Sequence, residues 1–243
     1  MQRTIKTLLS LCTLLATAYT LSAQSADEIV EKHIQAMGGK AKLDSLKTLS
    51  IEGTFRVEHY ELPLKAFLAD QVGERFNVTV LKTPGFIIVT PDKGWEYFPF
   101  QGMKDPKPLA KDDLETYLPS LDLKGPLVDY KSKGSSLRYE GLADVDDITC
   151  YKLAITLQSG KEMTGYVDTS TYYIVKTTVP GKQNGKDIVT ENMYGNYQRT
   201  PDGFVLPFAL SLGPGKAFVT KVTVNAPIDA NAFDPEEAKK AGF

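Results

Sequence analysis

The chain has 243 residues, with 28 basic and 30 acidic side chains and a formal net charge of −2. Proteins that bind nucleic acids use an excess of basic residues against the phosphates, so this composition argues against a nucleic-acid partner. About 220 residues follow the N-terminal segment described next, which is enough for one large β domain or two small ones.

Residues 1–24 have the three parts of a secretory signal peptide. Arg3 and Lys6 give the start a positive charge, an apolar run extends from Leu8 to Leu21, and the small residues of SAQSA follow. The apolar run is shorter than the roughly 20 residues that a membrane-spanning helix needs. We therefore expect export, with cleavage between Leu21 and Asp27 and a single mature domain over residues 25–243.

The two cysteines predict neither a lipid anchor nor a disulfide. Cys12 follows Leu11 instead of a small residue, and the apolar run continues past it, which argues against lipid attachment. Cys150 alone remains after cleavage, so the mature chain has no internal disulfide. Within TCYKLAITL it is predicted to be a small buried hydrophobe, since a reactive thiol would need cationic neighbours.

The mature chain is predicted to begin with a helix over Ala26–Met37. Ser25 or Asp27 can cap its start, and Gly38 can end it in a left-handed conformation. Its apolar residues fall on one stripe at helical spacing. These are Ile29, Val30, Ile34 and Met37. A shorter helical turn is expected at Ala41–Leu46.

From Thr48 onward the pattern alternates between apolar and polar residues, as in TLSIEGTFRV, RFNVTVLK and KLAITL. Turn sequences such as PG, SG, NG and PDG separate the runs, which predicts a mainly β (α+β) fold with a meandering antiparallel sheet. We expect one face to be covered and the other to meet water. The residues expected on the covered face are Phe55, Phe76, Val78, Trp95, Tyr97, Leu153 and Ile155, and those expected to face water are Glu52, Arg56, Lys152 and Thr156.

The segment Lys104–Lys133 interrupts this rhythm with four prolines and a helical patch at Lys111–Leu118. It contains too many apolar residues for a solvated linker. We therefore expect it to pack back over the sheet.

No catalytic or metal site is predicted. His33 lies beside the apolar stripe of the first helix, and His59 has only Glu58 and Glu61 as neighbouring candidate ligands. The acidic stretch 144–147 lacks the glycine and the distal glutamate of an EF-hand and is predicted to be a solvated turn. No nucleophile, phosphate-binding or dinucleotide motif appears. The many strand aromatics, as in VTPDKGWEYFPFQG, fit either a thick core or a hydrophobic groove that helices fill only in part.

Several segments resemble the LolA-like periplasmic family of outer-membrane lipoprotein-sorting proteins. ADEIVEKHIQAMGGKAKLDSLKTLSIEGT resembles the start of these proteins, and VTPDKGWEYFP resembles their V-x-D-G-x-x-x-W-x-Y-x-P hairpin. DLKGPLVDYKSKG, YKLAITLQSGKEMTGYVDTSTYYIVK, GNYQRTPDGFVLPF and VNAPIDANAFDP also fit. The resemblance therefore spans nearly the whole mature chain.

The resemblance implies a curved antiparallel half-barrel with helices over its concave apolar face. It also implies a monomeric periplasmic carrier, without a cofactor, that shelters lipoprotein acyl chains or another lipid between membrane-bound donor and acceptor proteins. In enterobacterial-type carriers an Arg-Pro pair is associated with holding the lid. The comparable stretch QVGERFNV has Arg75 without the proline, so the role of Arg75 stays open.

On this resemblance the seven apolar residues expected on the covered face would line the acyl-binding groove. The lid would carry Ile34, Met37, Leu114 and Leu118. Two other functions remain open for the same fold, a periplasmic sensor or adaptor module that binds a protein partner, and an enzyme.

Overall fold

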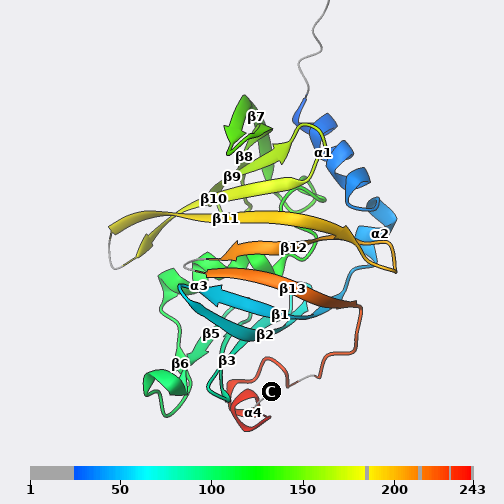
Figure 1. The fold of residues 1–243 in the computed structure, drawn as a ribbon. Coiled ribbons are helices and arrows are strands. Elements are labelled where there is room, and N and C mark those ends of the chain that lie inside the picture. The colour runs from blue at the N-terminus through cyan, green and yellow to red at the C-terminus, as the bar shows by residue number, and fades with distance from the viewer. Residues whose placement is uncertain (1–24, 184–185, 213–214, 230, 242–243) are drawn as a thin grey trace, which may run out of the picture.

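The computed structural model describes residues 25–183, 186–212, 215–229 and 231–241 (Figure 1). The signal peptide predicted for residues 1–24 lies outside this part. The described residues form one open sheet of 13 antiparallel strands with a few short helices, so the predicted fold class is confirmed.

The sheet consists of two meanders joined at a central seam. Strands β1 to β6 pair in chain order, and so do strands β7 to β13. The seam is the antiparallel pairing of β1 with β13, and β6 and β7 form the two edges. The strands are β1 (Thr48–Val57), β2 (Tyr60–Ala69), β3 (Gly73–Val80), β4 (Thr83–Val89), β5 (Gly94–Tyr97), β6 (Lys107–Pro108), β7 (Ser136–Val145), β8 (Ile148–Thr156), β9 (Glu162–Asp168), β10 (Ile174–Gln183), β11 (Lys186–Arg199), β12 (Val205–Leu212) and β13 (Gly215–Val224).

The predicted helices are all present. They are α1 (Ala26–Ala36), α2 (Lys40–Asp44) and α3 (Lys111–Tyr117), together with the 3-10 helices η1 (Pro99–Gln101) and η2 (Leu118–Leu121) and a C-terminal helix α4 (Pro235–Ala241). Ser25 caps α1 through a capping box, in which its hydroxyl accepts from the Glu28 amide at 3.2 Å and its own amide donates to the Glu28 carboxylate at 3.0 Å.

Alternation assigns two faces to the sheet, as predicted for most strands. The inner face carries Phe55, Phe76 and Ile155, and the outer face carries Glu52 and Lys152, which form ion pairs with neighbouring strands. Because opposite residues of an antiparallel pair point to the same side, the register of the strand pairs fixes these assignments throughout the sheet. Arg56 and Thr156 share the outer face with Glu52 and Lys152, as expected.

The core lies between α1 and the inner face of β8 to β10. Ile29 of α1 and Leu153 of β8 are fully buried in one cluster, together with Ile155, Leu127 and Val167. Burial of each such side chain contributes about 1.5–3 kcal/mol, so this cluster holds α1 on the sheet. The predicted covering role of the segment after residue 104 is confirmed, because Leu127 from this segment packs in the same cluster.

The prediction for Trp95 and Tyr97 is wrong. Phe76 pairs with Ile87, whereas Trp95 pairs with Ile88 and Tyr97 with Phe86. Trp95 and Tyr97 therefore lie on the outer face, opposite to Phe76. The reason is that the outer face is also covered at this end of the sheet, so apolar character no longer distinguishes the two faces.

Helix α4 and the residues before it provide this second cover. Ala238 of α4 is buried against Phe86 and Ile88, and Trp95 packs against the same cluster (Figure 1 shows α4 beside β3). Arg75 also lies on the outer face, where its Nη2 donates to the Ala238 carbonyl at 3.3 Å and its guanidinium lies over the Phe86 ring. Arg75 thus contacts the C-terminal helix.

Candidate functional site

The inner face has a buried half and an open half. The buried half lies under α1 and is filled by the core cluster described above. The open half lies on both sides of the β1–β13 seam, where several apolar side chains are only partly buried among buried neighbours such as Leu64 and Ala217. We define it by five residues that share the inner face: Phe55, Leu62, Phe76, Ile87 and Leu210.

Two aromatic rings form the centre of this open half. The rings of Phe55 and Phe76 meet edge to face, with centroids 5.5 Å apart. Gly215 of β13 leaves room for Phe55, since a Cβ atom at Gly215 would lie 2.2 Å from the ring. Such an edge-to-face pair contributes about 0.5–1.5 kcal/mol beyond the free energy gained from burying the ring surfaces. The contact therefore holds both rings in place although they are partly exposed.

Helix α3 crosses the open half from one flank of the sheet to the other. Leu114 approaches Gly94 of β5 at one flank, and Thr116 approaches Gly181 of β10 at the other. Lys161, in the turn between β8 and β9, donates to the Glu115 carbonyl at 2.8 Å. In Figure 1, α3 lies close to the middle of the sheet. The helix is only weakly held, because it has no buried residue and no side-chain N-cap.

The segment after α3 is anchored to the turn between β2 and β3. The Gln71 amide donates to the Leu121 carbonyl at 2.9 Å, and the Leu123 amide donates to the Asp70 carboxylate at 3.2 Å. Leu121 itself is buried. These contacts attach the end of η2, and with it the end of the covering segment, to the sheet.

A carboxyl group lies under this cover. Glu74 pairs with Leu68 and Val89, which places it on the inner face beside Phe76, and the Ser120 hydroxyl of η2 donates to it. Burial raises the pKa of the Glu74 carboxyl, and the Ser120 hydrogen bond lowers it in part. Burial also raises the pKa of the Tyr117 hydroxyl in α3, with a further contribution from Glu74.

The predicted site residues therefore divide into three groups. Phe55 and Phe76 lie together in the open half, and Leu114 and Leu118 lie on the α3–η2 segment that covers it. The inner-face residues that are instead buried are Val78, Leu153 and Ile155, and Ile34 packs against the core cluster while Met37 forms the C-cap of α1. Trp95 and Tyr97 lie on the other face.

Sequence reasoning missed Leu62, Leu210, Glu74 and Tyr117. Leu62 pairs directly with Phe55, and alternation within YELPLKAFLA was the signal that would have found it. Glu74 had no such signal, because a carboxylate inside a strand is ordinarily assigned to the water-facing side.

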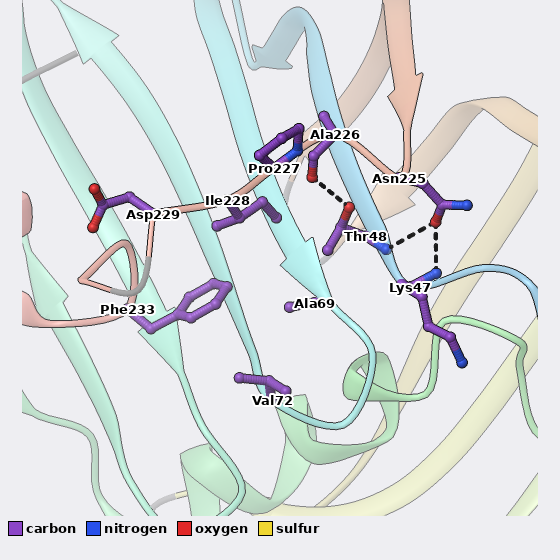
Figure 2. A pocket seen from close by; sticks show the side chains of 10 residues that line it. All are labelled: Lys47, Thr48, Ala69, Val72, Asn225, Ala226, Pro227, Ile228, Asp229 and Phe233. Atoms are coloured by element: carbon purple, nitrogen blue, oxygen red, sulfur yellow. Dashed lines mark hydrogen bonds between the residues drawn. The ribbon is translucent and has the colours of Figure 1, made fainter.

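Two pockets formed by the described residues lie on the outer face, away from the open half. The first, of about 430 Å³, lies between β1, β2 and the segment after β13 (Figure 2). Its wall is closed by the Thr48 hydroxyl, which donates to the Ala226 carbonyl at 2.7 Å, and by Phe233 facing Val72. The second, of about 340 Å³, is lined by residues that include Tyr166, Lys176 and Met193.

The remaining candidates for chemistry are Cys150, His59 and the acidic stretch 144–147. Cys150 is fully buried, as predicted, and burial raises the pKa of its thiol to about 11. His59 is exposed in the turn between β1 and β2, and Asp146 and Asp147 form an exposed turn between β7 and β8. Among the described residues, no group of three or more His, Cys, Asp or Glu side chains could hold a metal ion. None of the helices in this part of the chain has the length and apolarity to cross a membrane.

His33 links α1 to the loop between β9 and β10, which contains Tyr172. The side chain is 3% exposed, and Nδ1 lies 2.8 Å from the Tyr172 carbonyl, to which it donates as the neutral or charged ring. Burial lowers the pKa of His33 below its ordinary value of 6.5, and the hydrogen bond to Tyr172 opposes this in part.

We expect acid to destabilise the chain through His33. Because the folded pKa lies below 6.5, the unfolded chain binds a proton first as the pH falls, and stability decreases by up to about 1.4 kcal/mol per pH unit until the folded pKa is reached. Urea unfolding at about pH 7.5 and 5.5 measures this loss, and His33→Gln should reduce it. His59→Gln is the matched control, and an equal loss in parent and His33→Gln would contradict the prediction.

No protein-family profile and no curated protein matches the sequence. Solved structures match its fold. An outer membrane lipoprotein-sorting protein domain from Vibrio parahaemolyticus matches with a TM-score of 0.57 at 12% identity, over 88% of this chain and 99% of that chain. A LolA superfamily protein from Nitrosomonas europaea matches with a TM-score of 0.52 at 11% identity, over the same shares of 88% and 99%.

The chain has a LolA-like fold. A DUF1329 family protein from Desulfovibrio piger shares it, with a TM-score of 0.55 at 10% identity over 88% of this chain and 99% of that chain. The TM-scores above 0.5 establish the LolA-like fold, and at identities this low the fold alone does not identify a ligand.

Proposed function

We propose that this LolA-like chain is a periplasmic carrier that binds the acyl chains of lipoproteins, or of another lipid, on the open half of its inner face. The observation that carries the proposal is the partly exposed pair Phe55 and Phe76 beneath α3, a helix without a buried residue. The secretory pattern of residues 1–24 supports export. Membrane-bound donor and acceptor proteins would load and unload such a carrier.

The physical task of a carrier fits this arrangement. Each methylene exposed to water costs about 0.8 kcal/mol, so one long acyl chain costs on the order of 10 kcal/mol. Phe55, Phe76 and their neighbours offer apolar contact, and α3 covers them when the ligand is absent. A weakly held cover allows both entry and release, because little free energy is needed to move it. The ligand would then lie between the sheet and α3.

We expect Phe76→Asp to abolish binding of the neutral probe N-phenyl-1-naphthylamine, whose fluorescence rises in apolar surroundings. A carboxylate in the centre of the open half would have to be desolvated by the bound probe, which lowers affinity at least about ten-fold. Phe218→Asp is the matched control, since Phe218 is partly exposed on the outer face opposite Thr54.

Thermal unfolding of both variants separates lost binding from lost folding. Probe binding that disappears in Phe76→Asp and persists in Phe218→Asp, with similar melting temperatures, supports the proposal. A parent protein that binds neither the probe nor any acyl ligand would refute it.

A further inference from the structure

Acidic groups lie both on the open half and on the α3–η2 segment that covers it. Glu74 lies on the inner face beneath η2, and Asp113 and Tyr117 belong to α3. Glu96 pairs with Ile87, which pairs with Phe76, so Glu96 shares the inner face beside the open half. Three carboxylates from three elements thus surround the surface proposed to hold the ligand.

These three carboxylates all influence the Tyr117 hydroxyl of α3. Beyond the effect of burial, the pKa of the Tyr117 hydroxyl is raised by Glu74, then Asp113, then Glu96, so all three are close enough to this hydroxyl to repel its ionised form. A negative charge on a ligand at the same place would meet the same repulsion.

None of the three carboxylates forms an ion pair within the part of the chain that the structure describes. Lys107 pairs in register with Glu96 on the edge strand β6, but its side chain is exposed. Lys161 donates to the Glu115 carbonyl. Arg75 and Lys65 point to the outer face. Lys111, at the start of α3, is also exposed and pairs with Glu115. Acidic side chains therefore outnumber the cations beside Phe76, and the side chains of Lys107 and Lys111 extend into solvent.

We infer that the open half selects amphiphiles whose head group carries no negative charge, such as neutral glycerides and the ester- or amide-linked chains of acylated proteins, over fatty-acid anions and anionic phospholipids. This inference rests on the carrier function proposed above. Apolar contact with Phe55 and Phe76 supplies affinity for any acyl chain, and the carboxylates decide among head groups.

The test compares three ligands with saturated chains of the same length as competitors of N-phenyl-1-naphthylamine at about pH 8. Monomyristoylglycerol is neutral, myristate is anionic and tetradecyltrimethylammonium is cationic. We expect the neutral and cationic ligands to bind at least about ten-fold more tightly than myristate, a difference that like charges within several ångströms readily produce. The comparison uses the parent protein and needs no variant to fold.

Variants then assign the effect to the carboxylates. Glu74→Gln combined with Glu96→Gln should reduce the difference in affinity between monomyristoylglycerol and myristate by strengthening myristate binding, because glutamine keeps the side-chain shape and removes the charge. Asp112→Asn is the matched control, since Asp112 is exposed on the same helix as Asp113. Myristate binding as tight as that of the glyceride in the parent would overturn the inference while leaving the carrier function intact. Failure of all three ligands to displace the probe would overturn both.

Discussion

Ala238→Asp should lower the stability of the chain by about 2–3 kcal/mol and shift the fluorescence of Trp95 to longer wavelength. Ala238 is 2% exposed and packs on Phe86 and Ile88, so a carboxylate there loses its hydration against an apolar surface, and the nearby Arg75 guanidinium, which donates to the Ala238 carbonyl, offsets only part of that cost. The variant can avoid that cost if α4 leaves the sheet, but this exposes the apolar surface beneath the helix. The free energy of exposing that surface therefore sets the upper limit of the lost stability. Trp95 is the sole tryptophan of the chain and packs against the same cluster.

Emission spectra, acrylamide quenching and urea unfolding check this expectation. Ala241→Asp is the matched control, because Ala241 is exposed on the same helix and the same charge is added. Unchanged emission and an unchanged urea midpoint in Ala238→Asp would show that α4 does not cover Trp95. A consequence for ligand assays is that Trp95 reports on the C-terminal cover of the outer face, so an extrinsic probe is needed for the open half.

Gly53→Ala should destabilise the β1–β13 seam by about 3 kcal/mol, which corresponds to a decrease of roughly 10 °C in the melting temperature. The register shifts between Glu52 and Gly53, and a Cβ atom at Gly53 would lie 2.2 Å from the backbone oxygen of Phe218. Backbone cannot move aside as a side chain can, so the two strands would have to separate locally.

Gly195→Ala provides the matched control for this substitution. Gly195 lies in β11 of the same sheet, and a Cβ atom there would have no neighbour within 4 Å. Differential scanning calorimetry of both variants measures the difference. Similar melting temperatures for Gly53→Ala and Gly195→Ala would show that the seam tolerates an added methyl group.

Local sequence patterns correctly predicted the elements whose structure depends on nearby residues alone. Ser25 and the stripe of Ile29 and Ile34 predicted α1, because capping and helical spacing both act within one turn or two. Alternation gave the correct face for Phe55 and Leu153, since each lies in a strand with one covered and one wet face.

The same rule failed where both faces of the sheet are covered. The run Phe86–Val89 is apolar at every position, which is typical of a strand buried on both sides, but it does not say what covers the second face. The cover is α4, far away in the chain, and the contact between Arg75 and Ala238 has no local signature. The open half likewise depends on where α3 crosses the sheet, and long-range packing decides this.

The seam between β1 and β13 has a consequence for the order of folding. Every other strand pair of the described sheet joins neighbours in the chain, so those pairs form by closing short loops, whereas Thr220 and Glu52 meet across the seam at a separation of 168 residues. Closing so long a loop is entropically costly and slow. During synthesis the unpaired edge of β1 must therefore wait for nearly the whole chain to emerge, and it remains open to aggregation throughout that interval.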